Sequence, residues 1–174
     1  MTEVRTREAT RVDLGRALKH GAVGGVIAGL IFPMFEMAMA ALQGDDPLAP
    51  LRMIGGIALG DQALDPGFSI LTAGAAGTAV HMMLSIVYGV VFGAAAAVVP
   101  FIISSSAIAA LAGAVLGTLL WVVNFYLIAP IFGWTWFPEM TDPLVQFVAH
   151  AGFFGVPLGL YVAWALRRGT PRAT

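Results

Sequence analysis

Four long stretches of apolar residues dominate the pattern of hydrophobic and polar positions along the chain. They cover approximately residues 21–42, 75–99, 106–129 and 143–166. A helix needs about 20 mostly apolar residues to cross the hydrocarbon core of a bilayer, and each stretch reaches that length. The fourth follows Asp142 and begins with Pro143, which is typical of a helix start, because Asp caps free N–H groups and Pro suits the first turn. The pattern therefore predicts an all-α fold, an integral membrane four-helix bundle.

The segment between the first two stretches, residues 43–72, is the longest part of the chain outside the predicted spans. Its middle, Leu51 to Gly60, is apolar but too short to cross a bilayer. We expect a short interfacial helix there, which lies on the membrane surface or folds back as a cap. The first stretch also resembles a signal peptide, with a small-residue sequence at Ala38 to Ala40. Its apolar run is long for a signal core and contains Glu36, so we expect a retained helix.

The composition supports the membrane interpretation. Of the 174 residues, 59% are hydrophobic and 11% are charged, and the mean hydropathy is +0.86. Soluble domains contain about 45–50% apolar and about 25% charged residues. These values exclude a soluble globular enzyme, a disordered tail and a nucleic-acid binder, which needs a basic surface. The chain has no Cys, which excludes disulfides, iron–sulfur clusters and thiolate zinc sites. The partner that we expect is the lipid bilayer, with no nucleic acid.

The basic residues fall almost entirely on one side of the predicted membrane domain. Eight of the nine Lys and Arg residues precede the first stretch or follow the fourth: Arg5, Arg7, Arg11, Arg16, Lys19, Arg167, Arg168 and Arg172. Only Arg52 lies in the opposite loop. Because Lys and Arg are enriched on the cytoplasmic side of membrane proteins, we expect an N-in/C-in topology. Residues 1–20 then form a cytoplasmic N-terminal segment, residues 21–166 the membrane domain and residues 167–174 a cytoplasmic tail.

Glycine recurs every four residues in all four stretches. The repeats are Gly21, Gly25 and Gly29; Gly89 and Gly93; Gly113 and Gly117; and Gly155 and Gly159. Small residues at this spacing let membrane helices approach closely. They predict a compact bundle, or association through Gly-rich faces with a second copy or a larger membrane complex. Glycine is also simply frequent in membrane helices, and this chain has 21 of them.

Few strongly polar side chains lie inside the predicted spans. They are Glu36, His81, Asn124 and His150, one in each span. If the helices alternate in direction, each residue lies roughly 7–10 Å inside the outer end of its helix, at a rise of about 1.5 Å per residue. The four residues then share one layer in the outer leaflet, with Gln146 at its rim. Ionisable residues inside a membrane are costly, usually face the bundle interior and are functional hypotheses by default.

Two imidazoles and a carboxylate are typical ligands of a transition metal ion such as Fe, Zn or Cu. We therefore expect Glu36, His81 and His150 to be metal ligands. Three further polar residues would surround them: Asn124, Gln146 and Tyr88. A second interpretation is a b-type haem with His81 and His150 as opposite axial ligands, because four-helix bundles hold such cofactors in their cores. The leading prediction is an outer-leaflet intramembrane pocket that binds a metal ion or haem.

Two other functions fit the same residues. A carboxyl and two imidazoles that exchange protons are typical of a proton-linked small-molecule transporter. Alternatively, the groups hydrogen-bond to one another and fix helix packing in a non-catalytic structural or accessory subunit of a membrane complex. The chain contains no Walker loop, no G-x-S-x-G elbow and no H-E-x-x-H motif, and these patterns leave open whether it catalyses a reaction.

Several short motifs are spread over the chain: Pro50 with Met53, His81, Trp121, Ala129-Pro130-Ile131-Phe132-Gly133, and His150 with Gly155 and Gly159. In these positions the chain resembles a loosely defined group of small four-helix prokaryotic inner-membrane proteins. The resemblance implies the four-helix fold, a location in the prokaryotic inner membrane and a shared pair of histidines. It implies no activity.

Overall fold

The computed structural model describes residues 12–168, and this part of the chain is helical with no strands. The α-helices are α1 (Leu14–Gln43), α2 (Ala49–Leu59), α3 (Ile70–Val98), α4 (Ser106–Val123), α5 (Ala129–Ile131), α6 (Trp136–Glu139), α7 (Pro143–Val148) and α8 (Val156–Arg168). Two short 3₁₀ turns, η1 (Asp61–Leu64) and η2 (Pro100–Ile103), connect them. Two further segments, η3 (Asn124–Ile128) and η4 (Ala149–Gly155), are π-helical.

In the described part of the chain, four helical spans are long and apolar enough to cross a membrane: Leu14–Gln43, Ile70–Val98, Ser106–Ile131 and Pro143–Arg168. The third span joins α4, η3 and α5, and the fourth joins α7, η4 and α8. Large apolar side chains such as Leu30, Met34 and Leu119 are exposed on the outside of the bundle. In a bilayer such side chains would contact lipid. The prediction of an all-α fold with four helices long and apolar enough to span a membrane is confirmed.

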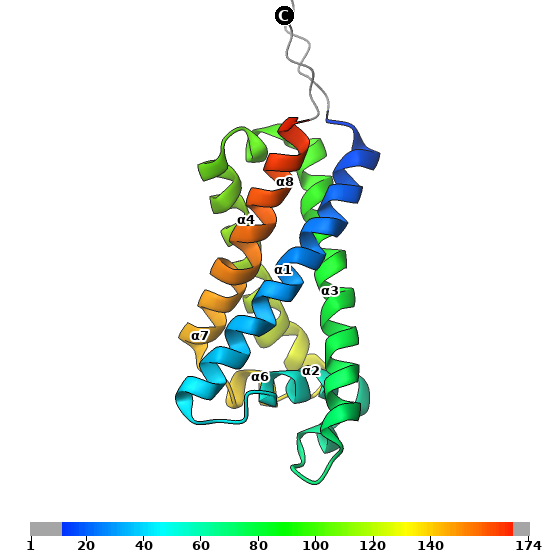
Figure 1. Cartoon of the computed structure of the whole chain (residues 1–174), viewed down its shortest axis with the longest axis vertical. Coiled ribbons are helices and arrows are strands. Elements are labelled where there is room, and N and C mark those ends of the chain that lie inside the picture. Colours follow the sequence, from blue (N-terminus) through cyan, green and yellow to red (C-terminus); the bar gives the residue numbers. More distant parts are fainter. Residues whose placement is uncertain (1–11, 169–174) are drawn as a thin grey trace, which may run out of the picture.

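The spans pack as two close pairs. α1 runs beside α3, α4 runs beside η4 and α8, and α1 also packs on α8 (Figure 1). The beginning of α1 and the end of α8 lie at the same end of the bundle, where the Arg16 guanidinium donates to the Ala165 carbonyl oxygen at 2.6 Å (Figure 1). The opposite end is crossed by α2 and α6.

Glycines allow the close approach within both pairs. A Cβ atom at Gly25 of α1 would overlap the backbone carbonyl oxygen of Ser85 in α3. Between α4 and η4, a Cβ atom at Gly113 would overlap the carbonyl oxygen of Gly155, and the reverse also holds. Only residues without side chains let two backbones come this close. The repeated glycines thus pack helices of this chain against one another.

α1 begins at Leu14, earlier than the apolar stretch that starts near Gly21. Asp13 caps this helix, because its carboxylate accepts a hydrogen bond from the Arg16 backbone N–H at 2.7 Å. The polar residues that follow therefore continue the helix beyond its apolar part. Hydropathy detects the apolar length of a helix, whereas capping sets where the helix starts.

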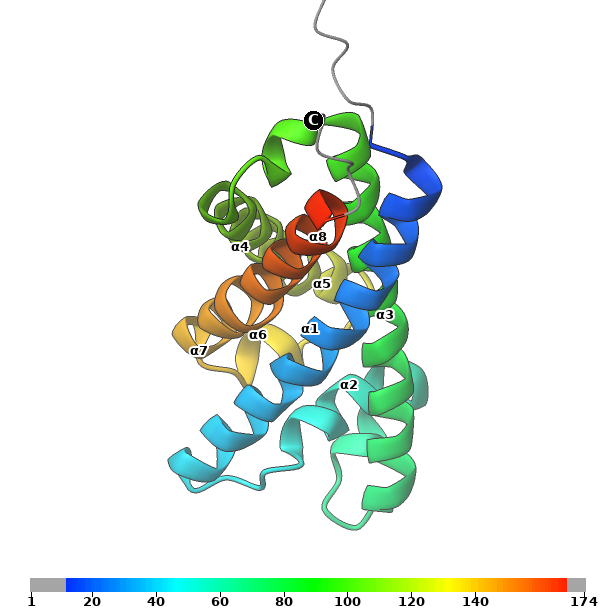
Figure 2. The same cartoon turned by 45° about the horizontal axis from the view of Figure 1, so that its top comes forward.

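α2 folds back over the bundle as a cap (Figure 2). It packs so closely on α3 that a Cβ atom at Gly77 would overlap the Leu51 carbonyl oxygen. The Trp136 indole N–H of α6 donates to the Met53 carbonyl oxygen at 3.1 Å. The Arg52 guanidinium donates to three carbonyl oxygens of the following segment, those of Ala63, Asp65 and Phe68. These contacts on three sides hold α2 across the end of the bundle.

Candidate functional site

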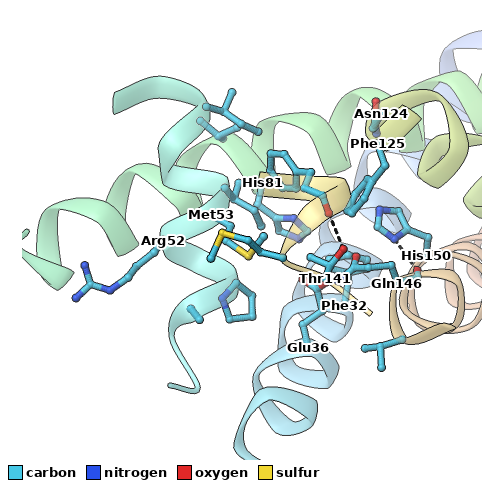
Figure 3. Close-up of a pocket in the computed structure, with 18 of the residues that line it drawn as sticks. Phe32, Glu36, Arg52, Met53, His81, Asn124, Phe125, Thr141, Gln146 and His150 are labelled. Carbon is cyan, nitrogen blue, oxygen red and sulfur yellow. Dashed lines mark hydrogen bonds between the residues drawn. The ribbon is translucent and has the colours of Figure 1, made fainter. Parts of the chain in front are cut away.

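A cavity of about 790 Å³ lies inside the bundle beneath α2 (Figure 3). Its walls come from α1, α3, α4, η3, α7 and η4, and its cover comes from α2 and the segment around α6. The six polar residues singled out from the sequence all line it: Glu36, His81, Tyr88, Asn124, Gln146 and His150. Most of the remaining lining is apolar, with aromatic rings such as those of Phe32 and Phe125. Polar residues from four separate spans therefore face one space.

The distances of these residues from the ends of their helices are less even than the sequence indicated. Glu36, Asn124 and His150 each lie about 10 Å from the nearer end of their span, at a rise of about 1.5 Å per residue. His81 lies about 16 Å from the beginning of α3, because that helix starts at Ile70. The additional turns of α3 reach past the layer of polar residues and support α2.

Glu36 and Gln146 form a buried pair. The Gln146 side-chain amide donates to the Glu36 carboxyl at 2.7 Å, and the two residues are 8% and 6% exposed, respectively. The other atom of the amide, Gln146 Oε1, is buried with no hydrogen-bond partner within residues 12–168. A buried acceptor without a donor costs about 1–3 kcal/mol. The pair therefore leaves an acceptor without a donor beside a carboxyl that lines the cavity.

Backbone carbonyls hold both histidines. His81 Nε2 lies 2.8 Å from the Gly29 carbonyl oxygen, and His150 Nδ1 lies 2.8 Å from the Gln146 carbonyl oxygen. Because a carbonyl oxygen only accepts, each of these ring nitrogens carries the hydrogen. In the neutral rings the lone pairs then lie on His81 Nδ1 and His150 Nε2. Each neutral imidazole thus donates its N–H to a backbone carbonyl, and its other ring nitrogen remains a hydrogen-bond acceptor.

The two imidazoles are packed against one phenyl ring. Phe32 stacks on His81 with ring centroids 5.2 Å apart, and it meets His150 edge-on at 4.8 Å. Phe125 contacts His150 from another side at 5.4 Å. Within the described part of the chain, no three His, Asp or Glu side chains are grouped so that they could hold a metal ion. The two imidazoles are therefore polar groups packed between aromatic rings.

Asn124 is engaged with Tyr88. The Tyr88 hydroxyl and the Asn124 side-chain amide lie 3.1–3.2 Å apart and form a hydrogen-bonded pair between α3 and η3. This pair joins helices from the two halves of the bundle across the cavity wall. Its polar atoms bond to each other.

Two π-helical segments carry Asn124 and His150. η3 begins at Asn124, and His150 is the second residue of η4. The second residue after each segment is a proline, Pro130 and Pro157. Proline has no N–H for the carbonyl four residues earlier, and its ring crowds that carbonyl, so a wider turn before it relieves the conflict. Single π-helical turns of this kind are frequent at functional sites.

The cover of the cavity was not predicted residue by residue. Met53 and Ile57 of α2 line the cavity, as does Phe137 of α6. One signal was present in the sequence, the adjacent glycines Gly55 and Gly56 within a short apolar segment. In the structure, α3 approaches Gly55 and the Trp136 ring approaches Gly56.

Comparison with protein-family models, curated proteins and solved structures finds no match for the chain. The function is therefore argued from the cavity itself.

Proposed function

We propose that the chain is a multi-pass protein of the prokaryotic inner membrane that binds a small ligand in the cavity of its outer half. Both termini would lie in the cytoplasm. The basic residues of the described chain support this orientation. Arg16, Lys19, Arg167 and Arg168 belong to the first turns of α1 and the last turn of α8, whereas α2 carries Arg52. Positive charge at the end where α1 begins and α8 ends favours the cytoplasmic side for that end.

The observation that carries the ligand hypothesis is a large cavity in the described chain whose lining includes a buried acceptor without a donor and two imidazoles that each keep a lone pair. Gln146 Oε1 lacks a partner within the described residues, and each imidazole keeps a ring nitrogen with a lone pair. Ligand sites are typically cavities of about 300–1,000 Å³ with mostly apolar walls and a few polar groups. The volume of about 790 Å³ and the aromatic lining fit that description. A ligand that donates hydrogen bonds would supply the donors that the packed helices do not offer to these acceptors.

The metal ion and the haem predicted from the sequence remain two classes of ligand for this cavity. One feature favours them: each imidazole donates its N–H to a backbone carbonyl, as metal-ligating histidines commonly do. A site that combines Glu36, His81 and His150 would require these side chains to come closer together than they lie here. We therefore propose that the cavity binds a small ligand. The experiment below distinguishes a metal ion and a haem from other ligands.

The test is the purification of the full chain in lipid nanodiscs, followed by native mass spectrometry, elemental analysis and an absorption spectrum. We expect an adduct of defined mass that the wild type retains and that Gln146→Leu and His150→Ala lose. Met34→Leu is the control for general lipid binding, because Met34 is 70% exposed on the outside of the bundle. A stoichiometric metal would identify an ion site, and a Soret band lost in His81→Ala would identify haem.

The outcome that would overturn the proposal is equally specific. If the wild type carries no adduct, no metal and no chromophore, and extracts of the producing cells do not raise its melting temperature, the cavity is not a ligand site. If the same cavity substitutions then weaken only unfolding stability, the polar groups act as a structural network that fixes helix packing.

A further inference from the structure

We infer that the ligand of this cavity is a protonated amine with an apolar body. The inference rests on the proposed function and names the ligand class for that same site. Three features lead to it: the hydrogen-bonding character of the free polar atoms, the charge of the lining and the aromatic walls.

Most of the polar atoms left free around Glu36 are acceptors. Gln146 donates an amide hydrogen to Glu36, and His150 donates its ring N–H to a carbonyl oxygen. Within the described residues, the acceptors that remain at this end of the cavity are the carboxyl of Glu36, Gln146 Oε1 and the lone pair of His150 Nε2, beside the second N–H of the Gln146 amide. A ligand that only accepts hydrogen bonds leaves all of these acceptors without partners. A ligand that carries several N–H groups satisfies them together.

The charge of the residues that line the cavity also favours a positively charged ligand. Four carboxyl residues line the cavity: Glu36, Asp45, Asp46 and Asp142. Arg52 is the single Lys or Arg residue in that lining within residues 12–168. Its guanidinium is engaged with carbonyl oxygens and with Asp46, and Figure 3 shows it pointing away from Glu36 and the two histidines. An excess of one sign of charge around a cavity with low-dielectric walls concentrates ligands of the opposite sign.

The walls supply the apolar part of the recognition. Six Phe, Tyr and Trp residues line the space: Phe32, Tyr88, Phe125, Trp134, Phe137 and Phe154. An ammonium group over the face of such a ring is attracted by the ring quadrupole. The volume of about 790 Å³ exceeds the needs of an ammonium group alone, so the remainder accommodates hydrocarbon. Because Gln146 Oε1 and His150 Nε2 need N–H donors, an amine that retains N–H hydrogens binds better than a quaternary ammonium.

The experiment compares four probes that share one hydrocarbon chain: octylammonium, octyltrimethylammonium, octan-1-ol and octanoate. Binding to the full chain in nanodiscs is measured by isothermal titration calorimetry, with empty nanodiscs subtracted. We expect saturable binding of octylammonium, at least tenfold weaker binding of octyltrimethylammonium and octan-1-ol, and no saturable binding of octanoate. Glu36→Gln keeps the shape of the side chain and an acceptor for the Gln146 amide, and it should weaken octylammonium binding at least tenfold. Met34→Leu should leave it unchanged.

Each alternative outcome has a distinct meaning. If octan-1-ol or octanoate binds as well as octylammonium, or if Glu36→Gln does not weaken the amine, the amine class is wrong while ligand binding in the cavity stands. If Zn²⁺ binds saturably, loses affinity in His81→Ala, and octylammonium does not bind, the cavity is a metal site and the inference fails. If no probe binds and the purified protein carries no adduct, metal or chromophore, the proposed function itself fails.

Discussion

Replacing Gly77 with Ala should lift the cover of the cavity away from α3. The new Cβ atom would overlap the Leu51 carbonyl oxygen, lie 3.0 Å from the Leu51 carbonyl carbon and lie 3.1 Å from the Gly55 nitrogen. All three are backbone atoms of α2, so no side-chain rotation relieves the contact. Carbon atoms pack best at about 3.5–4.0 Å, so α2 has to move by roughly 1 Å.

Gly74→Ala is the matched control on the same helix. A Cβ atom at Gly74 meets no atom within 4 Å. Both substitutions add one methyl group and the same gain in helix propensity, about 0.5–1 kcal/mol, so this contribution cancels between them. Overpacking against a fixed neighbour costs about 1–3 kcal/mol. We therefore expect Gly77→Ala to be less stable than Gly74→Ala by about 1–3 kcal/mol.

The assay is unfolding in mixed detergent micelles with increasing SDS, which measures the free energy of unfolding of both variants. The fluorescence of Trp136 reports on the cover directly, because its indole bonds to Met53 of α2 and its ring packs against Gly56. With the other three tryptophans replaced by Phe, we expect a red-shifted native emission in Gly77→Ala only. Equal unfolding free energies and equal emission in both variants would refute close packing at Gly77 as what holds α2.

Three further predictions concern single contacts and use the same unfolding assay. A double-mutant cycle of Tyr88→Phe and Asn124→Leu should give a coupling of about 0.5–1.5 kcal/mol, and strictly additive losses would contradict a bond between the two residues. Ser105→Ala removes the side chain that caps α4 and should cost about 1 kcal/mol, so an unchanged stability would contradict this role. Gln146→Leu takes the hydrogen-bond donor from Glu36, which costs about 1–3 kcal/mol, but it also removes the unpartnered Oε1, so the net loss of stability should lie at the lower end of that range. The same substitution in a Glu36→Leu background should cost less, and an equal cost there would speak against the pair.

Much of the candidate site followed from the sequence because helix geometry is regular. Glu36, Asn124 and His150 could be placed near one depth from the helix ends alone, since the rise per residue is nearly constant. Asp142 could be assigned as a helix start, and its carboxylate does accept hydrogen bonds from the backbone N–H groups of Leu144 and Val145. The distance of His81 from the beginning of its helix was underestimated, because the residues before the apolar stretch continue α3 outward.

The hydrogen-bond partners of the site could not be read from the sequence. A buried polar side chain bonds to whichever donor or acceptor the packing brings near, and backbone carbonyls are present at every residue. His81 bonds to Gly29 and His150 to Gln146, so each ring presents one particular nitrogen to the cavity. The sequence contains both histidines but has no signal for which nitrogen remains free.

The sequence by itself determined the four membrane spans and the polar residues within them, because burial in lipid leaves few places for polar side chains. It left open whether the short apolar segment after the first span lies on the membrane or covers the bundle. Only the tertiary structure decided that α2 is a cover, through the contact of Gly77 with Leu51 and the bond from Trp136 to Met53. Such contacts join residues far apart in the chain, and their energies depend on backbone approach rather than on local composition.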